Sequence, residues 1–114
     1  AVSLFEETPS DQGHQANQRE PDRMAFARVH NTLAVARFHA DDASGALVHI
    51  KKALEMDDTF AEAHNNAGLI YVKLGEPRTA LEHLETALQI NPKFDRARIN
   101  YDATMRILQQ DPGK

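Results

Sequence analysis

Apolar residues recur three and four positions apart from Arg23 onward, as at Leu47, Ile50 and Leu54. This spacing is typical of amphipathic helices. Short runs rich in Asp, Asn, Gly or Pro interrupt it, and such runs mark turns. The pattern therefore predicts five helices and no strand, over residues 24–40, 43–56, 60–74, 77–90 and 94–110.

Three residues mark the expected ends of these helices. Asp42 stands just before the second helix, where its side chain can cap free backbone N–H groups. Gly75 suits the end of the third helix, and Pro77 suits the first turn of the fourth, where its missing N–H would have no partner.

The N-terminal segment has a different composition from the rest of the chain. Residues 9–22 hold two prolines, one glycine and no large apolar side chain. Such a stretch cannot bury enough surface to offset the entropy lost on ordering. We therefore expect residues 1–22 to be a flexible tail, residues 23–110 to be one domain and residues 111–114 to be disordered.

The domain contains an internal repeat of 34 residues. Residues 27–60 and 61–94 align without a gap and share nine identical pairs, whereas residues 95–110 continue the match only through one helix. A fixed period of this length indicates a stack of helix pairs. The identical pairs are Ala27/Ala61, His30/His64, Asn31/Asn65, Ala46/Ala80, Leu47/Leu81, His49/His83, Ala53/Ala87, Leu54/Leu88 and Phe60/Phe94.

The spacing of small and large residues resembles the tetratricopeptide repeat, a helix–turn–helix unit of about 34 residues. The resemblance implies an all-α, right-handed solenoid of helical hairpins, with two repeats and a capping helix at 95–110. The first repeat departs from the family pattern at Arg37, where Tyr is usual, and at Asp58, where Pro is usual. The residues that carry the pattern are Ala34, Ala46 and Ala53 in the first repeat and Gly68, Tyr71, Ala80, Ala87 and Pro92 in the second.

Composition narrows the function without naming it. The 114 residues suit one small domain, the formal charge of −4 gives no reason to expect nucleic acid, and no cysteine is present. No apolar run approaches the roughly 20 residues of a membrane span, and no signal peptide is visible. The sequence leaves the compartment open between cytoplasm and periplasm.

Six histidines are the main candidates for chemistry. However, His30 and His64 occupy one repeated position, and His49 and His83 occupy another, so they fit a scaffold better than a catalytic or metal site. No Gly-rich phosphate loop, nucleophile motif or HExxH is present. We expect no enzyme activity, no cofactor and no bound metal.

The resemblance implies that the first helix of each pair lines a concave face that binds proteins or extended peptides. Asn side chains there could hold a peptide backbone by donating and accepting at once. Some family members clamp a free C-terminal carboxylate, and Arg28, Thr32, Asn66, Arg96 and Asn100 stand at the matching positions, with Thr32 and Asn100 departing from the pattern. The expected peptide-binding residues are Arg28, Asn31, Thr32, Asn65, Asn66, Leu69, Lys73, Arg96 and Asn100.

Two alternatives remain. Two repeats and one helix are fewer than the three repeats usually needed for stability, so the ends of the stack could pair into a homo-oligomer, with Phe26 and Phe38 as candidate contacts. The domain could instead be an accessory part of a larger secretion, pilus-assembly or glycosyltransferase protein.

Overall fold

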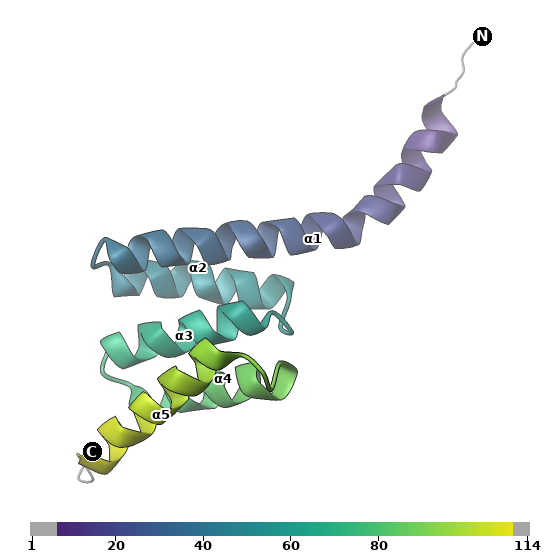
Figure 1. Cartoon of the computed structure of the whole chain (residues 1–114). Coiled ribbons are helices and arrows are strands. Elements are labelled where there is room, and N and C mark those ends of the chain that lie inside the picture. The colour runs from purple at the N-terminus through teal and green to yellow at the C-terminus, as the bar shows by residue number, and fades with distance from the viewer. Residues whose placement is uncertain (1–6, 111–114) are drawn as a thin grey trace.

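Five helices make up the described part of the chain, which is residues 7–110 in a computed structural model whose side chains are described from residue 22 onward. The all-α prediction is confirmed, and the last four helices end within one residue of their predicted bounds. Consecutive helices run back and forth as hairpins in one stack (Figure 1). The helices are α1 (Glu7–His39), α2 (Ala43–Met56), α3 (Ala61–Lys73), α4 (Pro77–Ile90) and α5 (Asp95–Gln110).

The start of α1 corrects the sequence analysis, which placed it near residue 24. The helix begins at Glu7 and includes most of the segment that we expected to be an irregular tail. Residues 7–22 include three Gln, two Glu, one Ala and one Arg, which favour helix. A helix that extends from packed residues also needs no new nucleus. Figure 1 shows α1 bending away from the stack toward its N-terminal end. Pro21 lies within this helix, and a proline without an amide hydrogen is a usual cause of such a bend. The flexibility of this segment stays a prediction, and the expected C-terminal tail lies outside the described residues.

The turns inside the two helix pairs share one backbone plan. Asp41 and Gly75 are 34 residues apart, and both have positive φ, at 65° and 83°. Glycine adopts this conformation without steric cost, whereas Asp tolerates it less well. The predicted N-cap is confirmed, because the Asp42 side chain accepts a hydrogen bond from the Gly45 amide at 2.9 Å. The equivalent Glu76 makes no such bond.

Small residues hold the helices of each pair close together. Ala34, Ala46 and Ala53 are fully buried in the first pair, and Ala80 and Ala87 in the second. Gly68 on α3 meets Leu84 on α4 so closely that an added Cβ would lie 2.6 Å from the Leu84 Cγ atom. These positions therefore set how near the helices approach.

The first helices of the successive pairs, α1, α3 and α5, lie next to one another. Contacts join α1 to α3 and α3 to α5, while α2 and α4 pack on the other side of the stack. This row of helices forms the face where the sequence analysis expected a binding groove, and we call it the inner face.

Candidate functional site

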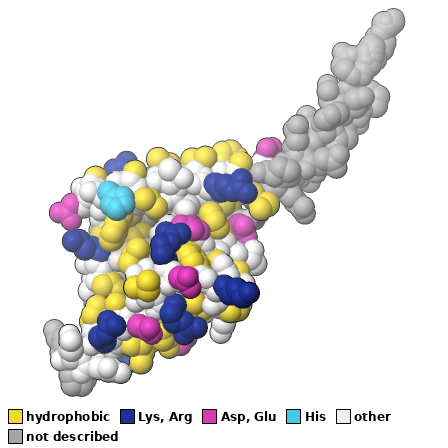
Figure 2. Space-filling model, in the orientation of Figure 1, with side chains coloured by type: hydrophobic (Ala, Val, Ile, Leu, Met, Phe, Trp, Pro, Cys, Tyr) yellow, Lys and Arg dark blue, Asp and Glu magenta, His cyan; other side chains and the backbone are white. Residues whose placement is uncertain are grey.

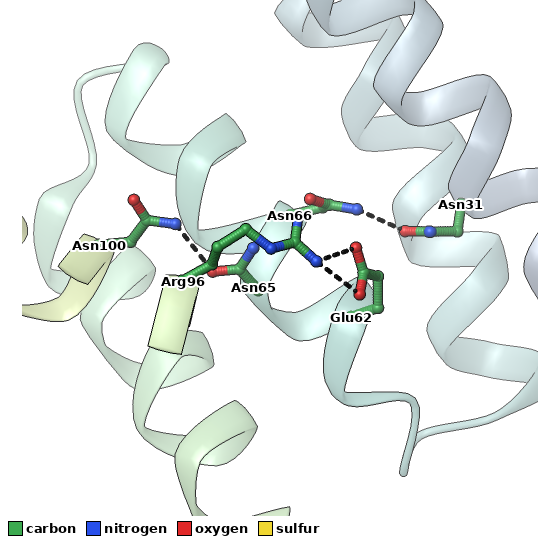
Figure 3. Close-up of polar contacts among 6 residues, drawn as sticks. All are labelled: Asn31, Glu62, Asn65, Asn66, Arg96 and Asn100. Atoms are coloured by element: carbon green, nitrogen blue, oxygen red, sulfur yellow. Dashed lines mark hydrogen bonds and ion pairs between the residues drawn. The ribbon is translucent and has the colours of Figure 1, made fainter. Parts of the chain in front are cut away.

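Asparagine side chains bridge the helices of the inner face. The Asn66 Nδ2 atom donates to Asn31 Oδ1 at 2.8 Å, which joins α3 to α1. The Asn100 Nδ2 atom donates to Asn65 Oδ1 at 2.9 Å, which joins α5 to α3 in the same way (Figure 3). Each bond spans 35 residues, so one pattern repeats at both junctions.

Burial shows what these amides do in the free protein. Asn65 is 1% exposed, and Asn31 and Asn66 are 9% and 8% exposed. Buried amides are costly unless they are hydrogen-bonded, and here they satisfy one another. The sequence analysis expected them to face a peptide, whereas the structure places them as bridges between helices.

The pattern of bridging amides is not continued on the outer sides of α1 and α5. Thr32 occupies in α1 the position of the donors Asn66 and Asn100, and it is exposed. Ile99 occupies in α5 the position of the acceptors Asn31 and Asn65, and it is 65% exposed. The bridge pattern therefore joins the three inner helices of this chain and stops there.

Two of the three cations among the expected peptide-binding residues already form ion pairs within the protein. Arg96 Nη2 donates to both carboxylate oxygens of Glu62, at 2.9 and 3.1 Å, and its guanidinium lies 5.3 Å from the centre of the Phe94 ring. Lys73 Nζ lies 3.7 Å from an Asp41 oxygen. Arg28 is exposed and forms no ion pair with the described side chains. A peptide carboxylate would therefore have to compete with Glu62 for Arg96.

Charges of both signs are mixed over the face of the molecule shown in Figure 2, with apolar side chains between them. No large area of that face carries one sign. Exposed ion pairs contribute little free energy, so these charges do little to stabilise the fold.

An apolar pocket lies between α1 and α3 on the inner face. Its volume is about 70 Å³. Leu69, one of the expected binding residues, contributes to its wall, and Asn66 supplies an amide. The lining residues are Ala34, Val35, Phe38, His39, Asn66, Leu69 and Ile70.

The side chains that could hold a metal ion do not converge. Among residues with described side chains, no group of three or more His, Cys, Asp or Glu residues is arranged to bind one. Four of the histidines instead lie in two pairs, His30 with His49 and His64 with His83. Both repeated positions are visible in the sequence, but their contact was not predicted. The equal separation of 19 residues in the two pairs was a usable signal for it.

Comparison with protein families identifies one of the two helix pairs. The tetratricopeptide repeat family model matches residues 61–94, which contain α3, α4 and the turn that follows. Residues 61–94 therefore match a tetratricopeptide repeat, and residues 27–60 form a helix pair with the same turn geometry. A comparison with curated proteins finds no match.

The family supports a general role as a protein–protein interaction module. No helix in the described part of the chain is both long enough and apolar enough to cross a membrane.

Proposed function

We propose that this domain is a non-catalytic module that binds an extended peptide or partner segment along its inner face. The observation that carries the proposal is the apolar pocket between α1 and α3, because it offers an anchoring point in the middle of the face. Its wall of Val35, Phe38 and Leu69 suits an aliphatic side chain.

The inner face suits an apolar anchor better than a carboxylate clamp. Asn31, Asn65 and Asn66 are bonded within the protein, and Arg96 is bonded to Glu62. Burial of one aliphatic side chain contributes about 1.5–3 kcal/mol. A peptide anchored at one pocket should therefore bind weakly, and polar contacts at Arg28 or Lys73 would adjust its preference for acidic neighbours.

A peptide panel tests this function. Each peptide presents one aliphatic residue in an extended sequence, with either a free or an amidated C-terminus, and binding is measured at low and physiological salt. We expect binding to depend on the aliphatic residue and to change little on amidation. Binding that requires the free carboxylate would instead assign the face to a clamp that includes Arg28.

A matched pair of variants locates the binding site. Leu69→Lys places a charge in the pocket and should abolish peptide binding, whereas Val48→Lys changes an exposed apolar residue on α2 and should not. Equal losses in both variants would contradict the assignment to the inner face. The double variant Asn66→Ala, Arg96→Ala is a poorer test, because Asn66 also bonds to Asn31.

One observation favours self-assembly as a second function. Phe26, Val29 and Leu33 on α1 are 55%, 52% and 40% exposed, although the equivalent Ala63 and Ala67 on α3 are fully buried. These three residues follow helical spacing and form one apolar stripe at the end of the stack. A sedimentation mass above that of the monomer, lost in Val29→Lys, would support pairing through this stripe. A monomer mass for the unchanged chain would exclude it.

A further inference from the structure

In each repeat, one pair of histidines connects the two helices. The Nδ1 atoms of His30 on α1 and His49 on α2 are 3.2 Å apart. The Nδ1 atoms of His64 on α3 and His83 on α4 are 3.1 Å apart. The same contact thus occurs at equivalent positions of both helix pairs, which makes it part of the repeat.

The rings of each pair meet edge to edge through these nitrogens. The ring centres are 5.4 Å apart in both pairs, and the ring planes differ by only 24° and 29°. The separation of the centres exceeds that of the nitrogens by about the width of one five-membered ring, so the two Nδ1 atoms lie near the line that joins the centres. This is the geometry of an N–H···N hydrogen bond.

The second pair has a defined arrangement of protons. His64 Nε2 lies 2.9 Å from the carbonyl oxygen of Asp58. A carbonyl only accepts, so a neutral His64 ring carries its proton on Nε2 and leaves Nδ1 as an acceptor. His83 must then donate from its Nδ1 atom to His64.

A hydrogen bond between two imidazoles allows only one proton between the facing nitrogens. If both rings were fully protonated, two N–H groups and two positive charges would face each other at about the distance of a hydrogen bond. We propose that each helix pair is closed by a one-proton histidine latch, and that a second proton between the facing nitrogens, bound at acidic pH, opens the latch and loosens the repeat.

The groups around each pair also make the histidines harder to protonate, because they lower the pKa of one histidine in each pair. Burial lowers the pKa of His83, and the charge on His64 lowers it further, whereas Glu82 opposes this. The Tyr71 ring stacks on His83 with centres 5.4 Å apart. Burial also lowers the pKa of His49, with His30, Arg37 and Lys52 acting in the same direction and Asp42 acting against them.

The effect on stability follows from counting protons. Histidines with a lowered pKa bind fewer protons in the folded state than in the unfolded chain, where the usual pKa is about 6.5. The latches therefore contribute their stability above about pH 6.5 and lose it as the pH falls. If the unfolded chain binds one proton more per pair than the folded chain, the unfolding constant rises about tenfold for each pair when the pH falls by one unit.

Urea unfolding of the full chain between pH 8 and pH 5 tests the proposal. The unchanged chain should show a steep rise of the unfolding constant below pH 6.5. The double variant His49→Gln, His83→Gln should lose most of this slope, because glutamine can donate to or accept from the remaining ring and does not titrate. The control His39→Gln changes an exposed histidine outside both pairs and should keep the slope. An identical slope in the double variant and the control would overturn the proposal.

A second measurement does not depend on the double variant folding. Nitrogen NMR of the imidazole rings in the unchanged chain at pH 8 should show His64 protonated at Nε2 and His83 protonated at Nδ1. Rings that both exchange freely between the two neutral forms, as an exposed imidazole does, would show that no latch exists.

Discussion

The first helix pair places Ala34 on α1 and Ile50 on α2, whereas the second places Gly68 on α3 and Leu84 on α4 at the equivalent positions. All four are buried at the contact between the helices of their pair. Ala34 has a methyl group that Gly68 lacks. The partner on the outer helix differs as well, because Ile50 branches at Cβ whereas Leu84 branches at Cγ. The two repeats therefore share the fit of the helix crossing, although the individual residues that form it differ.

The turns and the latches show the same kind of exchange. The first turn places Asp41 at positive φ but has a capping bond from Asp42, and the second has Gly75 at positive φ and no side-chain cap. Tyr71 stacks on the histidine of the second pair, while Arg37 occupies that position in the first. Each turn therefore combines one favourable local feature with one less favourable feature, and the aromatic stacking adds a further favourable contact to the second repeat.

The largest expected effect comes from breaking the crossing of the second pair. Gly68→Leu should lower the free energy of unfolding by about 1–3 kcal/mol, because the new side chain has no space beside Leu84. Urea or thermal unfolding measures the loss. An unfolding transition that matches the unchanged chain would show that the close approach at Gly68 does not limit the packing.

A double variant sharpens this prediction. Gly68→Ala alone adds a Cβ that would lie 2.6 Å from Leu84 Cγ, so it should destabilise despite the better helix propensity of Ala. Gly68→Ala with Leu84→Ile recreates the combination of the first pair and should recover most of the loss. If the second change brings no recovery, the two crossings are not equivalent.

The next largest effect is expected from removing one hydrogen bond between the inner helices α1 and α3. Asn66→Ala leaves Asn31 Oδ1 without its donor and should cost about 1–3 kcal/mol. Thr32→Ala removes the exposed residue at the equivalent position of α1 and should change stability by less than about 0.5 kcal/mol. Unfolding experiments on the two variants, run together, would contradict the bridging role of the amides if the losses were equal.

The sequence predicted the regular helices well because their apolar residues recur at helical spacing. It missed the N-terminal extension of α1, because a polar segment without apolar residues at helical spacing gives no periodic signal even when its residues favour helix. It found the Asn positions of the inner face but not their partners. Whether Asn66 faces a ligand or Asn31 depends on the approach of α1 and α3, which only the packed stack determines.

The smallest effect comes from making the first repeat resemble the second. Arg37→Tyr should place a ring against His49 as Tyr71 lies against His83, and an aromatic contact of this kind contributes about 0.5–1.5 kcal/mol. The change also removes the exposed Arg37–Asp42 ion pair, which is worth little, so a small net gain in stability is expected. Burial and His30 are the larger causes of the lowered pKa of His49, and the Arg37 charge is a smaller one, so removal of that charge should raise this pKa only part of the way to its ordinary value. NMR titration of His49 measures this shift beside thermal unfolding. If the pKa of His49 stays unchanged while stability rises, the Arg37 side chain affects the packing of the first pair without influencing its latch.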